Sequence, residues 1–244
     1  MKKIIPLLYA AFLAAAPSLF AADFEGKVTM KLSGARELPP SLTYSIKGTA
    51  TRIDLTAPGE AGRVAMLTDS TKQEMVILML DQKMFMTQPI PKVSGASVAA
   101  AGSLPESTLE KTAVTEKILG YDCVKYTSKS KSGTTELWVT EQLGSFSGLG
   151  GGNPLTGGLS GGRGSAAGNA SASAWEKALA GLNAFPLRVV STEGGKESFR
   201  MEATAVDRQT IPSAAFVAPT DFQDLSAMMR GMALPPGMKL PGGN

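Results

Sequence analysis

The chain has 244 residues, with 24 Lys or Arg, 21 Asp or Glu, one Cys and no His. Without histidine, His-based catalytic triads, His general bases and most zinc sites are excluded. Acidic and basic residues are interspersed and nearly equal in number, which argues against a nucleic-acid or strongly anionic partner. The single cysteine, Cys123, excludes an internal disulfide.

The N-terminus has the features of a secretory signal peptide. Lys2 and Lys3 precede an apolar run from Ile4 to Leu13, and small residues follow up to Ala21 and Ala22. The run is shorter than the roughly 20 residues that a membrane-spanning helix needs, and no other stretch is long and apolar enough to replace it. We therefore predict a signal peptide over residues 1–21, export to the periplasm or the medium, and no transmembrane segment after cleavage.

The region from Phe24 to Thr140 contains many short segments in which apolar and polar residues alternate. A period of two is typical of β-strands with one buried face. Turn signals at Pro39-Pro40, at Pro58-Gly59 and around Asp69 separate the segments. The expected strands are 24–32, 42–47, 52–55, 63–68, 75–80, 83–87, 115–126 and 134–140.

The segment from Met75 to Leu80 is apolar on both faces, so we expect it to be covered on both sides. With its hairpin partner it forms a candidate ligand-binding surface, because the unbranched methionine side chain adapts to irregular shapes. The alternative is an ordinary core strand beneath a helix such as the one that carries Trp175. The residues assigned to an apolar ligand-binding cavity are Met75, Ile77, Met79, Met84, Met86, Trp138 and Trp175.

The second half of the chain begins with a change in composition. Glycine, serine and alanine dominate residues 145–170, which predicts a disordered insertion. A helix is expected over 173–182, with Ser173 as its N-cap. Strands are expected at 187–192, 197–206 and 214–217, followed by a short helix over 222–230 and a frayed tail over 231–244. Residues 22–229 then form one domain, a curled antiparallel sheet with one or two packing helices.

Several short motifs resemble one family of exported proteins. They are Phe24–Val28, Arg52–Asp54, Met79–Met86, Ile118–Cys123, Glu136–Thr140 and Phe216–Pro219. The chain resembles the exported domain-of-unknown-function 4412 family, which is similar in turn to the LolA/LolB-like lipoprotein carriers. The resemblance implies a half-open barrel with helices that close one mouth and a concave apolar face that receives acyl chains. No residue-level match to a lipoprotein-handling site is present.

Other site chemistries have simpler structural interpretations. Met228, Met229, Met232 and Met238 offer thioethers for Cu(I), but their spacing also fits an amphipathic packing helix. Cys123 lacks a histidine base and is interpreted as a small buried residue. The strand carboxylates are interpreted as a solvated outer face and not as an acid/base pair; they are Asp54, Asp122, Glu136 and Glu202. We therefore expect no enzymatic activity, no cofactor and no metal site.

The function expected from these features is non-enzymatic binding or transport in the periplasm. The ligand would be a lipid, a lipoprotein or another hydrophobic molecule. The alternative is an envelope module for protein–protein interaction or sensing without a small ligand, and Cu(I) binding comes third. An enclosed apolar cavity of several hundred Å3 would favour a ligand, on the order of known ligand pockets, whereas a filled barrel would favour the interaction module.

Overall fold

The computed structural model describes residues 24–34, 39–56, 62–69, 71–89, 109–130, 133–146, 148, 175–176, 179 and 182–226. Several sequence predictions lie outside these residues. They are the signal peptide over 1–21, the tail over 231–244, the Met228–Met238 cluster and all of the 145–170 insertion except three residues. Those three are Ser145, Phe146 and Gly148, and Phe146 is buried in the core.

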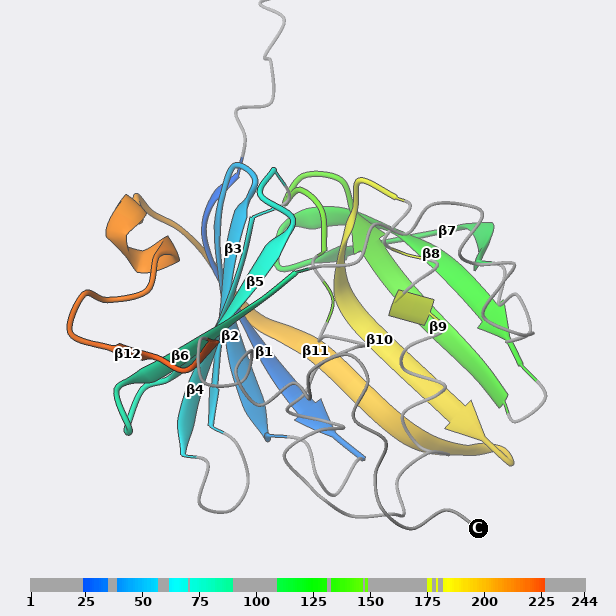
Figure 1. The fold of residues 1–244 in the computed structure, drawn as a ribbon. Coiled ribbons are helices and arrows are strands. Elements are labelled where there is room, and N and C mark those ends of the chain that lie inside the picture. Colours follow the sequence, from blue (N-terminus) through cyan, green and yellow to red (C-terminus); the bar gives the residue numbers. More distant parts are fainter. Residues whose placement is uncertain are drawn as a thin grey trace, which may run out of the picture.

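The described residues form twelve strands in one sheet. These are β1 (Glu25–Ser33), β2 (Ser41–Lys47), β3 (Ala50–Thr56), β4 (Arg63–Asp69), β5 (Glu74–Met79), β6 (Met84–Pro89), β7 (Leu109–Ile118), β8 (Tyr121–Lys129), β9 (Gly133–Thr140), β10 (Phe185–Glu193), β11 (Lys196–Arg208) and β12 (Gln223–Asp224). Their order is β12-β6-β5-β4-β3-β2-β1-β11-β10-β9-β8-β7. The predicted mainly β fold with a single curled sheet is confirmed, and Figure 1 shows the sheet curling without closing.

Neighbouring strands are antiparallel except β12, which runs parallel to β6. The antiparallel order follows from the tight turns in the sequence, since each short turn returns the chain beside the preceding strand. β1 pairs with β2, its neighbour in the sequence, and also with β11 from the far end of the chain. This pairing joins the N-terminal and C-terminal halves of the sheet.

The prediction of one strand over 115–126 was wrong, because the chain turns back in the middle of it. Ile118 pairs with Tyr121, and the two residues between them, Leu119 and Gly120, have φ values of 50° and 88°. Two positive φ angles in a two-residue loop are typical of a type I′ hairpin, whose twist matches that of the strands. The apolar run through Ile118 and Leu119 hid this turn, since leucine rarely adopts a positive φ.

The C-terminal segment 209–226, which we call the strap, also differs from prediction. Residues 213–216 form a 3₁₀ helix, η2 (Ser213–Phe216), instead of a strand. The helix expected over 222–230 does not begin at 222. Gln223 and Leu225 instead donate backbone hydrogen bonds to Lys83, just before β6, and to Phe85 in β6, at 2.9 and 2.8 Å. Pairing with an existing strand outweighs local helix propensity here, and Ser226 is the one described residue of 222–226 that is α-helical. The other predicted packing helix is represented by helical residues Trp175, Glu176 and Leu179.

The sheet has two different faces. On the inner face, cross-strand neighbours form a continuous apolar row: Val28, Tyr44, Ile53, Met66, Ile77 and Met86. Trp175, Leu179 and Phe146 belong to the same core cluster. On the outer face Ala65, Leu67 and Leu78 form a second cluster, against which Ala218 and Phe222 of the strap pack. β5 is therefore covered on both faces, as predicted.

Candidate functional site

The methionine-rich hairpin lies on the inner face of the sheet. Ile77 pairs with Met86, and Met79 pairs with Met84 across β5 and β6. Ile77 is buried at 2% exposure, whereas the methionines of this group are only partly buried. The structure therefore brings five of the seven predicted site residues onto one surface, the methionine margin. Its members are Met75, Ile77, Met79, Met84 and Met86.

The two predicted tryptophans lie apart from each other. Trp175 is buried among core aromatic residues and stacks on Phe146 at a centroid distance of 5.8 Å. Trp138 lies on the face opposite its neighbours in the core, Leu137 and Val139. Its ring has the Lys125 Nζ at 5.0 Å and the Arg188 Cζ at 5.2 Å from its centroid. Trp138 is therefore a cation–π residue of the outer face, as the strand alternation itself indicates.

Two polar atoms in the aromatic cluster are unsatisfied. The Tyr44 hydroxyl and the Trp175 Nε1 are buried and have no hydrogen-bond partner among the described residues. Both rings contact Phe146, at 5.6 and 5.8 Å between centroids. Burial raises the pKa of Tyr44 well above 10.0, and the Glu176 carboxylate adds to this shift. Most buried polar groups in proteins have a partner, and the only other described side-chain atom of this kind is Nε1 of Trp138, on the outer face.

We expect Tyr44→Phe to raise the free energy of unfolding by about 1 kcal/mol, because it removes a buried hydroxyl that makes no hydrogen bond with the described residues. Urea unfolding of the two proteins at neutral pH measures the difference. Tyr121→Phe, at a partly exposed tyrosine, serves as the matched control and should change stability by less than about 0.5 kcal/mol. A loss of stability in Tyr44→Phe would mean that the hydroxyl has a partner in the folded protein.

The carboxylates singled out in the sequence are all paired with cations. Asp54 pairs with Arg52 at 2.7 Å and Asp122 with Lys117 at 3.1 Å. Glu136 pairs with Lys125 and Glu202 with Arg188. Arg188 also reaches Glu116 of β7 at 2.8 Å, so its guanidinium links three strands of the outer face. Within the described ranges, no group of three or more His, Cys, Asp and Glu could hold a metal ion.

Cys123 is a free, buried thiol at 1% exposure. Burial raises its pKa from 9.0 to about 11, and the carboxylate of Glu116 adds to this shift. The thiolate is the reactive form of cysteine, so this environment disfavours nucleophilic chemistry at neutral pH.

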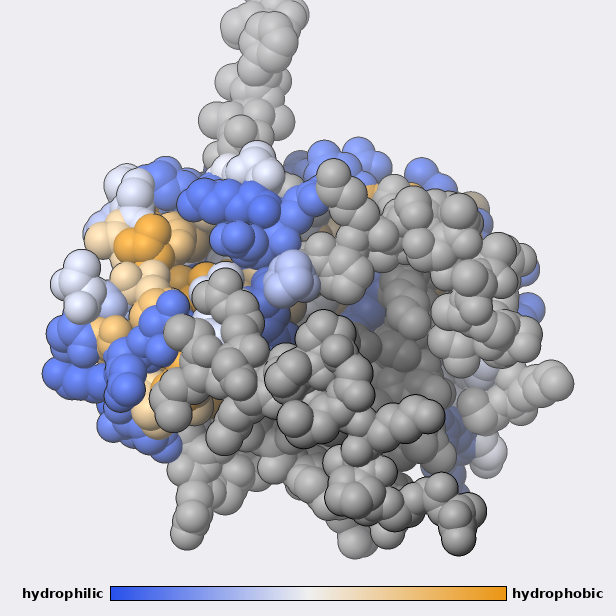
Figure 2. Space-filling model, in the orientation of Figure 1, coloured by the Kyte–Doolittle hydropathy of each residue, from blue (hydrophilic) through white to orange (hydrophobic). Residues whose placement is uncertain are grey.

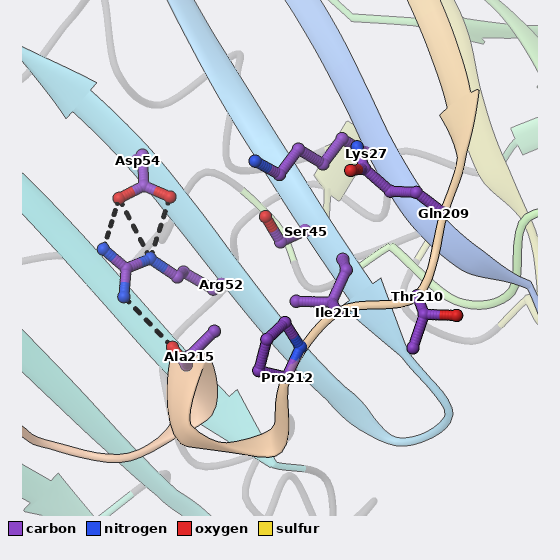
Figure 3. A pocket seen from close by; sticks show the side chains of 9 residues that line it. All are labelled: Lys27, Ser45, Arg52, Asp54, Gln209, Thr210, Ile211, Pro212 and Ala215. Carbon is purple, nitrogen blue, oxygen red and sulfur yellow. Dashed lines mark hydrogen bonds and ion pairs between the residues drawn. The ribbon is translucent and has the colours of Figure 1, made fainter.

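A second surface, which the sequence did not indicate, lies between the strap and the outer face of β1–β3. It is a pocket of about 390 Å3 lined by Lys27, Ser45, Arg52, Asp54 and five strap residues, Gln209, Thr210, Ile211, Pro212 and Ala215 (Figure 3). Arg52 Nε lies 3.0 and 2.9 Å from the two carboxylate oxygens of Asp54. The Arg52 NH1 group donates to the carbonyl oxygen of Ala215 at 3.0 Å, which ties the strap to β3.

The strap is held at both ends. At its start, Glu25 accepts hydrogen bonds from the backbone N–H of Ile211 at 2.6 Å and from Lys47 Nζ at 3.0 Å, and these bonds lower the pKa of Glu25. At its end, Ser226 Oγ accepts a hydrogen bond from the backbone N–H of Thr87 at 2.8 Å. In Figure 2, hydrophobic residues gather on the side of the described surface where η2 and β12 lie in Figure 1. Because these hydrogen bonds fix the strap at both ends, the pocket beneath it is a defined part of the fold.

The fold and these surfaces define a class: an open, curled antiparallel β-sheet protein with an apolar inner face and a polar outer pocket. The chain belongs to the family described as Domain of unknown function (DUF4412), whose sequence model matches residues 24–222. The family resemblance expected from the sequence is confirmed. No curated protein matches the chain. In the part of the chain that the structure describes, no helix is both long and apolar enough to cross a membrane.

Similar solved structures share little sequence with this chain. An uncharacterized conserved protein from Thermus thermophilus is 11% identical with a TM-score of 0.47; the match covers 84% of this chain and 92% of that one. PNGF-II is 13% identical with a TM-score of 0.42, covering 85% of this chain and 32% of that one. MucB in complex with MucA(peri) is 12% identical with a TM-score of 0.38, covering 83% of this chain and 56% of that one.

Proposed function

We propose that the protein is an exported, non-enzymatic binding protein that holds a lipid acyl chain on the methionine margin of its inner face. The observation that carries this proposal is the partial exposure of Met75, Met79, Met84 and Met86 beside a continuous buried apolar surface. Most apolar side chains of the sheet's inner face are buried, so these four stand out. Flexible, polarizable thioethers suit a ligand without a fixed shape.

The chemistry of the inner face fits an amphipathic ligand. The apolar row that ends at Met86 on β6 leads through Ile77, Met66 and Ile53 to Tyr44. Tyr44 and Trp175 each carry a buried polar atom that lacks a partner among the described residues. Ligand pockets commonly combine a mainly apolar lining with a few polar groups that fix orientation. An acyl chain along the methionine margin matches the apolar lining, and the fully buried Tyr44 hydroxyl lies at the far end of this row.

A second candidate is an envelope interaction module without a small ligand. It is favoured by the filling of the centre of the inner face, where Trp175, Phe185 and Leu187 are at most 1% exposed. A centre filled in this way leaves the margin of the sheet, and not its middle, as the place for a ligand.

Native mass spectrometry of the full chain, expressed with its N-terminus and purified from the periplasm without detergent, tests the proposal. We expect a mass for the protein cleaved after Ala21 or Ala22, with adducts of lipid mass that organic extraction removes. Retention of residues 1–21 would contradict the export part. A clean apo mass with no uptake of added fatty acid or phospholipid would contradict lipid binding and favour the interaction module.

A double variant locates the site. Met79→Gln with Met84→Gln places two polar amides on the margin and should weaken binding of a fluorescent fatty acid by about tenfold or more, because about 0.8 kcal/mol is lost per acyl CH₂ that no longer contacts an apolar surface. The matched control is Val114→Gln, at a valine of β7 that is already 52% exposed. Equal weakening in both variants, or none in either, would place the lipid elsewhere.

A further inference from the structure

We propose that the polar pocket under the strap binds the carboxylate group of a small ligand. The pocket lies on the outer face, opposite the methionine margin, so this inference does not depend on lipid binding. Its floor is a row of cross-strand neighbours: Lys27 of β1 beside Ser45 of β2, and Ser45 beside Arg52 of β3. Its wall is the strap from Gln209 to Ala215.

The donors of the pocket exceed its acceptors. The Lys27 side chain makes no ion pair or hydrogen bond with any described residue. Ser45 is only 3% exposed, and its hydroxyl likewise has no partner in the described part of the chain. Figure 3 shows the Lys27 ammonium and the Ser45 hydroxyl directed into the same space above β2. Both groups can therefore donate to one acceptor placed in this space.

Arg52 also lines this pocket. A guanidinium has five N–H groups. Nε and one N–H of NH2 donate to Asp54, and one N–H of NH1 donates to the Ala215 carbonyl. The other two N–H groups have no hydrogen-bond partner among the described residues. Because Asp54 and the Ala215 carbonyl hold the guanidinium in place, little side-chain freedom is lost when a ligand binds.

Charge selects the class of anion. Asp54 neutralises Arg52, so Lys27 supplies the single uncompensated positive charge among the charged residues of the described lining. A monoanion matches that charge, whereas a phosphate dianion would bring a second negative charge close to the Asp54 carboxylate. The volume of about 390 Å3 and the apolar contacts of Ile211, Pro212 and Ala215 fit a carboxylate on a small organic body such as an acylated amino acid.

Isothermal titration of the full mature protein with N-acetylalanine tests the inference, with N-acetylalaninamide and inorganic phosphate as comparison probes. We expect saturable binding of the carboxylate, no binding of the neutral amide, and weaker binding of phosphate. Lys27→Met should lower the affinity by about tenfold or more, as expected when a charged hydrogen bond is lost. Lys31→Met, four residues further along β1 and also exposed, is the matched control and should leave the affinity within about twofold.

Three results would overturn the inference: no saturable binding of N-acetylalanine, equal binding of the amide, or equal losses in Lys27→Met and Lys31→Met. Tighter binding of phosphate than of carboxylate would overturn the assignment to monoanions. Ser45→Ala adds a second readout at the Ser45 hydroxyl, with an expected loss of about threefold to tenfold. Because Lys27 is exposed, its variant leaves the core intact, and unchanged Tm values of the lysine variants verify this.

Discussion

Phe185→Ala is expected to lower the free energy of unfolding by about 3–5 kcal/mol. Phe185 is fully buried and meets Tyr44 edge-on, with 5.2 Å between centroids and an interplanar angle of 89°. It meets Phe146 in the same way, at 5.5 Å and 86°. Removing the ring leaves a cavity where β2, β10 and the segment after β9 come together, and the surrounding rings cannot close it without losing their own contacts.

Urea unfolding followed by circular dichroism and tryptophan fluorescence measures this loss. Because domains of this kind are stable by only about 5–15 kcal/mol, the variant should unfold at a much lower urea concentration. Val114→Ala, on an exposed part of β7, is the control and should stay within about 0.5 kcal/mol of the unchanged protein. A cost below about 1 kcal/mol for Phe185→Ala would contradict the packing of the aromatic cluster.

The folded protein is also expected to lose stability between pH 9 and pH 11 because of Cys123. Its pKa is 9.0 in an exposed thiol and about 11 in the fold, since burial favours the neutral form. Below pH 9 both states keep the proton and the contribution to stability is complete. As the pH rises from 9 to 11 the unfolded chain releases the proton first, so stability falls, by about 3 kcal/mol in total.

A comparison with Cys123→Ala isolates this effect from the titration of lysines. The difference in unfolding free energy between the unchanged protein and the variant should shrink as the pH rises from 8.5 to 11, because only the unchanged protein carries the buried thiol. Tyr44 shifts in the same direction above pH 10, and both proteins retain it, so it cancels in the difference. Parallel stability curves for the two proteins would contradict the raised thiol pKa.

The two faces of one sheet separate the two proposed sites. Alternation along each strand puts apolar residues on the inner face and polar residues on the outer face, at least over β1–β3. Over β4 and β5 the outer face is apolar as well, and the strap covers it. The strap thus has two roles in the fold. Phe222 packs against the apolar part of the outer face, and residues from Gln209 to Ala215 form one wall of the polar pocket.

The sheet and the faces of its residues could be predicted from local patterns in the sequence. Period-two alternation at Val28 and Met30, at Tyr44 and Ile46, and around Trp138 predicts the buried side of each strand, because successive side chains must point to opposite faces. The apolar run of β5 likewise predicted burial on both sides. These are properties that neighbouring residues set through backbone geometry alone.

The meeting of distant segments could not be predicted in this way. β12 and η2 are short and have weak local preferences, so hydrogen bonds to β6 and the contact of Arg52 with Ala215 set their conformations. The pocket depends on the same long-range contacts: Lys27, Ser45 and Arg52 share a row only because β1, β2 and β3 pair in one register. Register and strap position arise from packing between residues far apart in the chain, which no local pattern encodes.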